Sequence, residues 1–293
     1  MTTRREKFGL LLGFAGVCLF AGTLPATRLA VATINPLFLT SARAAVAGCT
    51  GLLVLMLLRR PLPSRAIAVE VFLAGSCTIL LFPLFTALAM MSVPASHGGV
   101  VLGVMPLATV AAAALFAHER PSPGFWLASA AGGMLVLIFI LRHGGMRGIG
   151  LGDLYLIGSV ISGALGYTFS GRLSTRMPGW EVISWSVVMF LPLAALATWA
   201  TWPANLAQVP WPAFAGLAYV SFISQYSAFF VYNAAMAMSG VARIGQVLLL
   251  QPFVIVALSV PVNGERLDPE IVLFAAAVVG VVLIGQRMRV TRG

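Results

Sequence analysis

Residues 101–106 of the chain read VLGVMP and residues 247–252 read VLLLQP, the same pattern about 146 residues later. The likeness extends outward to cover residues 87–138 and 233–284. Apolar identities count for little in such a sequence, but prolines and Glu-Arg pairs are rare in it and recur in register. These recurring residues are Pro106 with Pro252, and Glu119-Arg120 with Glu265-Arg266. We interpret the chain as a duplicated half-chain.

The composition indicates an integral membrane protein. The 293 residues are 60% hydrophobic and only 9% charged, and their mean hydropathy is +0.99. A soluble domain has about 25% charged residues. The net charge of +10 does not indicate a nucleic-acid partner, because the cations are dispersed between apolar blocks as the positive-inside rule expects. The lipid bilayer is therefore the expected partner.

The cysteines and histidines give no sign of a disulfide framework, a metal site or a cofactor. Cys18, Cys49 and Cys77 are odd in number and lie in apolar runs without C-x-x-C spacing. The three histidines are scattered without ligand spacing. The chain also lacks a P-loop and any nucleophile-base arrangement, so we expect neither ATP hydrolysis nor enzymatic activity.

Ten apolar segments each approach the length of about 20 residues that spans a bilayer. We predict spans at residues 8–30, 36–58, 68–91, 95–117, 124–141, 152–173, 180–202, 211–238, 242–262 and 269–287. In the sixth span, small residues at steps of four form one helix face, suited to close packing or to sliding between moving helices. They are Gly158, Ser162, Gly166 and Ser170, and Gly22 of the first span corresponds to Gly166.

The distribution of Lys and Arg residues predicts the orientation. Most of them fall on one side of the membrane if the N-terminus is cytoplasmic. We expect a multi-pass protein of the inner cell membrane with both termini in the cytoplasm. Because each half has an odd number of spans, the two repeats, residues 1–145 and 146–293, must be inverted relative to each other. The predicted fold is an all-α membrane protein of ten transmembrane helices, arranged as two inverted five-helix repeats.

The chain resembles the drug/metabolite transporter superfamily, specifically the ten-span exporters built from two EamA-type halves. The likeness rests on Pro252 followed by residues 263–267 (NGERL), and on Pro106 followed by residues 118–120 (HER). Within the superfamily it is most similar to the bacterial aromatic amino-acid exporters. The resemblance implies a central cavity between spans one, three and four and spans six, eight and nine.

One departure from the family concerns charge. The family typically has a Glu before the ninth-span proline, where this chain has Gln251. All eight acidic residues fall at span ends or in loops, so none is retained at the bilayer centre for function. This pattern disfavours proton-coupled antiport and favours facilitated diffusion or exchange, although Asp153 near a span start is able to titrate. For the two Glu-Arg pairs we expect short, solvated turns.

Aromatic and amide side chains in the spans are the candidate substrate-binding residues. Along the eighth span, aromatic residues and Asn233 recur at three- and four-residue steps and are expected to share one face. The candidates are Asn233, Tyr226, Phe229, Gln225, Phe222, Gln246, Gln251, Tyr167, Phe82, Phe85 and His97. Each also has a structural interpretation: aromatic stripes pack against lipid or core, amides pair with other helices, and His97 suits an interface.

The function we expect is export of small metabolites, above all amino acids with aromatic or apolar side chains, by alternating access without ATP. Aromatic walls would hold the side chain, and amides and helix ends the zwitterion. A nucleotide-sugar or phosphate-ester exchanger, with a basic cavity supplied by Arg28, Arg43 or Arg243, is one alternative. A lipophilic-drug efflux protein is another. The partners expected are a small-molecule substrate and lipid, with the chain a monomer or homodimer.

Overall fold

The computed structural model describes residues 4–116, 119–143, 149–174, 176–239, 247–286 and 290–292. The N-terminal part comprises α1 (Arg4–Ala21), α2 (Thr23–Val31), α3 (Pro36–Leu57), α4 (Arg65–Gly75), the π-helical η1 (Ser76–Leu81), α5 (Phe82–Ala89), α6 (Ala95–Leu102), α7 (Met105–Phe116), β1 (Glu119–Pro121) and α8 (Pro123–His143). The C-terminal part comprises α9 (Leu151–Leu173), α10 (Gly179–Ala200), η3 (Leu206–Gln208), α11 (Trp211–Ala218), the π-helical η4 (Tyr219–Ser227), α12 (Ala228–Ser239), η5 (Leu248–Leu250), α14 (Gln251–Asn263), α15 (Pro269–Gln286) and β2 (Val290–Arg292).

Apolar helices long enough to cross a membrane dominate this structure, which agrees with the expected membrane protein. Within the described ranges, seven segments meet the length and hydropathy of a span. An eighth is a pair, Ala95–Leu102 with Met105–Phe116, bent by 41°, and two further apolar helices, Gln251–Asn263 and Pro269–Gly285, are shorter. The number of ten spans and their inversion stay predictions.

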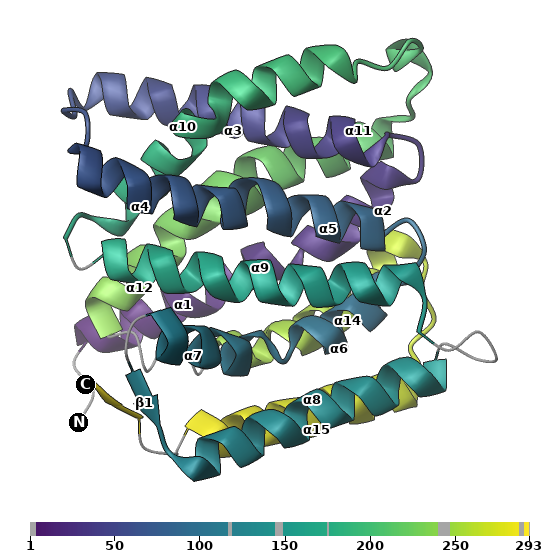
Figure 1. Cartoon of the computed structure of the whole chain (residues 1–293). Helices are drawn as coiled ribbons and strands as arrows, with labels where there is room; N and C mark the ends of the chain where they lie inside the picture. Colours follow the sequence, from purple (N-terminus) through teal and green to yellow (C-terminus); the bar gives the residue numbers. More distant parts are fainter. Residues whose placement is uncertain are drawn as a thin grey trace.

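Helices from the two parts of the chain lie side by side rather than forming separate bundles (Figure 1). α1 packs against α12, α3 against α10, α6 against α14 and α8 against α15. The α3–α10 and α8–α15 pairs run along opposite edges of the molecule (Figure 1). The space between these edges is therefore bordered by both parts of the chain.

Glycines of α9 allow close packing against the third apolar segment, as the spacing of small residues predicted. A Cβ atom at Gly158 would lie 3.0 Å from the Phe85 ring, and one at Gly166 would lie 2.4 Å from a methyl group of Thr78. Any larger residue at these positions would push α9 away from η1 and α5.

Breaks in helical hydrogen bonding occur where prolines interrupt the spans. Pro106 and Pro252 have no N–H to donate, and each lies next to a bend or a 3₁₀ turn. Pro83 is the second residue after η1, and the N–H of Phe82, which follows η1 directly, donates to the carbonyl of Cys77.

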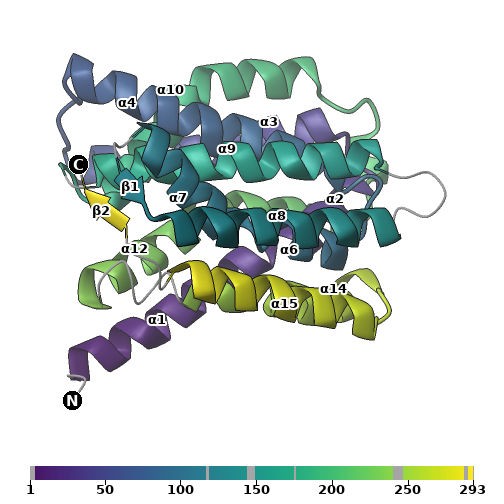
Figure 2. The ribbon, with the colours of Figure 1, turned by 60° about the horizontal axis from the view of Figure 1, so that its bottom comes forward.

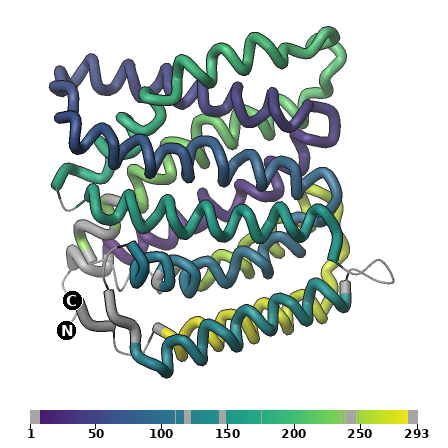
Figure 3. The backbone as a smooth tube through the Cα atoms, in the orientation of Figure 1, coloured from purple at the N-terminus to yellow at the C-terminus, as the bar shows by residue number. Residues whose placement is uncertain are grey.

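The backbone runs back and forth between two ends of the stack (Figure 3). At one of these ends lie the start of α1 and the two strands, β1 and β2 (Figure 2). β1 pairs antiparallel with β2 so that Glu119 is opposite Arg292, a short ribbon that the all-α prediction did not include. The first Glu-Arg pair is thus part of a strand rather than a free turn.

Candidate functional site

A cavity lies among the helices and holds about 920 Å³ of space between atoms, its opening included. Its wall comes from α1, α2, α3, η1, α5, α6 and α7 in the N-terminal part, and from α9, η4, α12, η5, α14 and α15 in the C-terminal part. Neither part encloses this space alone.

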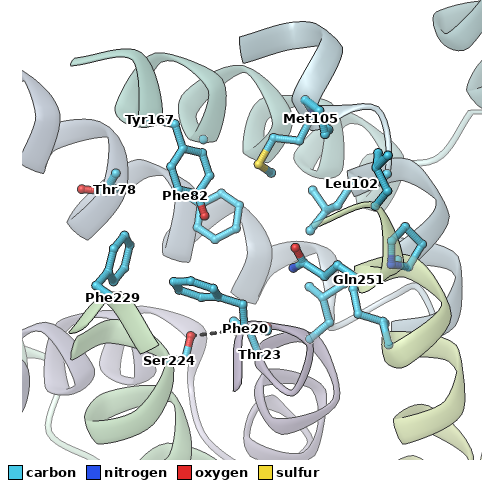
Figure 4. Close-up of a pocket in the computed structure, with 18 of the residues that line it drawn as sticks. Phe20, Thr23, Thr78, Phe82, Leu102, Met105, Tyr167, Ser224, Phe229 and Gln251 are labelled. Carbon is cyan, nitrogen blue, oxygen red and sulfur yellow. Dashed lines mark hydrogen bonds between the residues drawn. The ribbon is translucent and has the colours of Figure 1, made fainter. Parts of the chain in front are cut away.

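Four aromatic rings form much of the wall. Phe20, Phe82, Tyr167 and Phe229 gather around the same space, and the side chain of Gln251 extends toward them (Figure 4). The rings of Phe20 and Phe229 meet edge to face with centroids 5.0 Å apart. Such rings offer apolar area and stacking faces to an aromatic or apolar group.

A small polar patch, formed by Thr23, Arg43, Thr78, Ser224 and Gln225, interrupts this apolar wall. The hydroxyl oxygens of Thr23 and Ser224 share a hydrogen bond of 2.7 Å (Figure 4). Gln225 donates from Nε2 to the Thr78 carbonyl at 3.4 Å. The patch joins the two parts of the chain and gives the cavity an orienting polar side.

Arg43 is the charged member of the polar patch. Its residue is only 3% exposed, and Nη2 donates to the Ser224 hydroxyl at 3.4 Å, while Nε has no hydrogen-bond partner. No acidic residue is among the described residues that line the cavity. An arginine in the middle of a span costs about 2.5–3.5 kcal/mol on insertion scales, so a purely structural arginine would be expected to have a carboxylate partner.

Lining residues at equivalent positions of the sequence repeat occur in pairs. Thr78 and Ser224 both line the cavity at the repeat spacing of about 146 residues. The same spacing relates three further lining pairs, Gly103 with Leu249, Met105 with Gln251 and Pro106 with Pro252. The duplicated stretch therefore supplies matching sections of the wall.

At the end of the stack where α6 begins, a carboxylate joins the two parts of the chain. Glu265 accepts hydrogen bonds from the N–H groups of Ala95 (2.6 Å) and Ser96 (3.0 Å) and from the Ser96 hydroxyl (2.5 Å). Its carboxylate also lies 3.6 Å from Nε of Arg28, which in turn donates to the carbonyls of Met90 and Val93. We call Glu265, Arg28 and Ser96 the closing cluster.

The closing cluster corrects the expectation of a solvated turn at the second Glu-Arg pair. The side chain of Glu265 is only 11% exposed, and it caps the start of α6, where a negative charge is favoured by the helix dipole. Nearby, Asn263 donates from Nδ2 to the carbonyl of Pro25 at 3.1 Å. These contacts hold α14 and its following loop against α2 and α6.

A second buried pair, His97 with Asp153, lies beside the cavity without lining it. Nε2 of His97 is 2.8 Å from Oδ1 of Asp153, and both residues are buried. Oδ2 of Asp153 accepts from the N–H of Gly150, which caps α9. The pair therefore joins the starts of α6 and α9. No cluster of three potential metal ligands occurs in the described part of the chain.

Comparison with known proteins decides the family. A description of the EamA-like transporter family matches residues 7–142 and again residues 150–286. The chain belongs to the EamA-like transporter family. It is also 38% identical over 279 residues to the "Uncharacterized transporter YdeK" of Bacillus subtilis (strain 168), covering 95% of this chain and 97% of the relative. The expected relation to the drug/metabolite transporters is thereby confirmed.

The fold of this EamA-like transporter also has a match among solved structures. A crystal structure that is 18% identical in sequence superposes with a TM-score of 0.63, covering 95% of this chain and 96% of the other. At this identity the likeness shows the fold alone. Family and relative together show a membrane transporter.

The structure brings some of the predicted site residues to the cavity and places others elsewhere. Those that line it are Phe82, Tyr167, Gln225, Phe229 and Gln251. Those in the described part that do not line it are Phe85, His97, Phe222 and Tyr226. The Phe85 ring stacks instead on the ring of Tyr155. Asn233 belongs to α12, but its side chain is not described, and Gln246 and Arg243 lie outside the described residues.

The expected common face of the eighth span is absent because η4 is π-helical. Its wider turn breaks the three- and four-residue steps on which that face was predicted. Phe222 is 50% exposed, whereas the hydroxyl of Tyr226 shares a 2.8 Å hydrogen bond with Ser184 of α10. Phe229, after the π-helical segment, turns to the cavity.

Sequence reasoning offered Arg43 only as a possible source of a basic cavity in the exchanger alternative, and it passed over Phe20 and Thr23. The signal available for Arg43 was its position inside an apolar run, at the eighth of the 22 residues of α3. Thr78 and Ser224 carried a signal too, since they occupy equivalent positions of the repeat.

Proposed function

We propose that this EamA-like transporter exports small metabolites by alternating access without ATP, and that amino acids with aromatic or apolar side chains are its first candidate cargo. The observation that carries the proposal is the cavity, whose wall has four aromatic rings and one polar patch. In this proposal the chain is two inverted five-helix repeats, residues 1–145 and 146–293. The two separate family matches support that division.

Cargo recognition would divide between the two kinds of wall. An aromatic or branched side chain would be buried among Phe20, Phe82, Tyr167 and Phe229, and burying such a group contributes about 1.5–3 kcal/mol. The polar end of the cargo would meet the polar patch and the amide of Gln251. A polar molecule without an apolar body would lack the larger part of this stabilisation.

Alternating access requires that each end of the cavity opens while the other is closed. The closing cluster supplies one such closure, and it involves residues of both repeats, so rocking of one repeat against the other would break it. With cytoplasmic termini, the closing cluster would lie on the outer side. The structure described would then be a state closed to the outside.

Counterflow into liposomes that contain the purified protein tests this function. We expect accumulation of radiolabelled phenylalanine or leucine when the liposomes are loaded with the unlabelled amino acid, and none in protein-free liposomes. Failure of every apolar and aromatic amino acid, with accumulation of a cation or a nucleotide sugar, would replace the proposed cargo.

Two phenylalanines of one apolar segment provide a matched pair for that assay. Phe229→Ala removes a ring of the cavity wall and is expected to lower cargo affinity by about tenfold, since tenfold corresponds to about 1.4 kcal/mol. Phe222→Ala removes a ring that is half exposed on the outside of the stack. We expect it to transport as the wild type does, and equal losses in both variants would contradict a specific cavity.

An exchanger of phosphate esters is the second candidate, and Arg43 is the observation that favours it. A dianionic phosphate usually requires several cationic or N–H donors. Arg43 is the one cation among the described lining residues, so this candidate ranks second to amino-acid export. The counterflow panel should therefore include a sugar phosphate and a nucleotide sugar, whose accumulation would favour this candidate.

A further inference from the structure

Arg43 has the features of a binding residue that lacks its ligand. It lies inside α3, it lines the cavity, and its residue is 3% exposed. A guanidinium has five N–H donors. The hydrogen bond found for Arg43 is a long one, from Nη2 to the Ser224 hydroxyl, and Nε has no partner. Buried guanidinium groups are normally paired with a carboxylate or phosphate, whose planar oxygens match the fork of donors.

The residues around Arg43 provide no anionic partner for it, so such a partner would have to be a ligand. The described residues that line the cavity include no Asp or Glu. The closest polar neighbour, Ser224, is neutral and already shares a hydrogen bond with Thr23. Other arginines that lie near carboxylates, Arg28, Arg60, Arg142 and Arg176, do so away from the cavity lining.

We propose that Arg43 is the anion-recognition residue of the cavity, and that the cargo is a monoanion: a single carboxylate attached to an apolar or aromatic body. The proposal rests on the transport function given above and narrows its cargo. The carboxylate accepts hydrogen bonds from the guanidinium, next to the hydroxyls of Ser224 and Thr23. The apolar body lies among Phe20, Phe82 and Phe229.

The same charge asymmetry bears on the amino group of an amino acid. An ammonium group in this cavity would meet aromatic faces, hydroxyls and amides, but no lining carboxylate. Since Arg43 repels a cation, an amino group contributes little to binding. An acid whose amino group is acylated therefore binds at least as well as the parent amino acid, and an amine without a carboxylate binds much more weakly.

Three ligands that share one phenyl body test this inference on the detergent-purified protein: L-phenylalanine, N-acetyl-L-phenylalanine and L-phenylalanine amide. Binding is measured directly by calorimetry, which avoids passive leakage of these molecules across liposomes. We expect N-acetyl-L-phenylalanine to bind at least as tightly as L-phenylalanine, and both to bind at least tenfold more tightly than the amide. An amide that binds as tightly as the acids would overturn the anionic cargo without any variant being made.

Variants then assign the preference to Arg43. Arg43→Gln should weaken binding of both acids by at least tenfold while leaving the amide unchanged or improved. Arg43→Lys, which keeps the charge but loses the planar fork, should lose less. The matched control is Arg65→Gln, which removes the same charge from the exposed start of α4 and should bind all three ligands as the wild type does.

The possible failures are distinguishable. If Arg43→Gln and Arg43→Lys are folded and keep the wild-type preference for acids, the role of Arg43 is overturned and the exporter function stands. If the wild-type protein binds none of the three ligands, and counterflow shows no apolar or aromatic amino acid either, both the anionic cargo and the proposed function are overturned. A melting temperature for each variant shows that it is folded.

Discussion

The two copies of the repeat share their backbone features and differ in their polar side chains. Each copy has a π-helical segment in its third apolar segment, η1 in the first and η4 in the second, and each has a lining proline after it. At equivalent positions, however, Met105 of the first copy corresponds to Gln251 of the second. The two copies therefore share a π-helical segment and a proline in the cavity wall, whereas the amide of Gln251 has no counterpart in the first copy.

The same contrast separates the two Glu-Arg pairs. Glu119 is part of β1, which pairs with β2 at the end where α1 begins. Glu265 instead caps α6 and lies beside Arg28 at the opposite end. One motif therefore fastens β2 near the C-terminus, and the other holds the two parts of the chain together. A duplicated motif need not keep one role once the two copies meet different neighbours.

The largest effect is expected from Glu265→Gln. A neutral amide keeps the size of the side chain but weakens charge-assisted hydrogen bonds to α6 and the pairing with Arg28, together about 2–3 kcal/mol. That amount shifts the equilibrium between closed and open states by roughly 30- to 160-fold. We expect a cysteine that replaces Leu24, which lines the cavity, to react much faster with an impermeant maleimide added outside cells.

The control for this measurement is Glu119→Gln, the same chemical change at the equivalent position of the first copy. It should leave the labelling rate unchanged, and the native cysteines must first be replaced by serine. Gln208→Cys at the exposed end of η3 should be labelled from outside, and Leu62→Cys should not. The reverse pattern would show that the closing cluster faces the cytoplasm.

The second effect concerns two glycines related by the repeat, Gly22 and Gly166. A Cβ at Gly22 would lie 2.2 Å from the hydroxyl of Tyr219, and one at Gly166 would lie 2.4 Å from Thr78. Alanine at either position should lower the free energy of unfolding by about 1–2 kcal/mol, because overpacking forces the helices apart. Gly171 is the control, since a Cβ there meets nothing within 4 Å. Thermal unfolding in detergent measures all three, and a neutral Gly22→Ala would show that η4 yields easily.

These glycines also show how far the sequence reached. The four-residue spacing in the sixth span and the correspondence of Gly22 with Gly166 were visible in the sequence, and both glycines are at close contacts. The membrane class and the family also followed from hydropathy and from the recurring prolines. Such features are local, so a linear pattern records them.

The features that the sequence did not disclose depend on hydrogen bonding or on distant neighbours. A π-helical turn leaves no mark in the spacing of apolar residues, so the common face of Phe222, Tyr226 and Phe229 was expected but is not formed. The burial of Arg43 results from the packing of α3 beside η4. Glu265 accepts hydrogen bonds from the start of α6, where Ser96 is 169 residues away in the sequence. Neither contact is predictable from residue type.

The third effect tests the difference between Met105 and Gln251. Gln251→Met makes the second copy like the first and removes an amide from the cavity wall, so we expect cargo affinity to fall by about five- to tenfold, the value of one hydrogen bond. Met105→Gln makes the opposite change where the side chain packs against Gly163. It should lower stability more than affinity, because the amide would be buried against a close-packed helix. Calorimetry with the tightest ligand of the phenyl series, together with melting curves, separates the two outcomes.

The smallest effect on binding is expected from His97, which the sequence offered as a candidate binding residue. Its ring contacts Asp153 at 2.8 Å and packs against Phe139 with centroids 4.7 Å apart, so it acts on the packing of α6 against α9. His97→Gln retains a donor toward Asp153 and should change cargo affinity by less than about twofold, since the substituted group lies outside the cavity lining. His97→Leu removes the hydrogen bond to Asp153, whose carboxylate then keeps only its contact with the N–H of Gly150. This variant should therefore lower the melting temperature. If His97→Gln weakens binding as strongly as Gln251→Met does, then the cavity extends to the start of α6 when the cargo is bound. The first copy would then contribute a polar binding residue of its own, at a position different from that of Gln251 in the second.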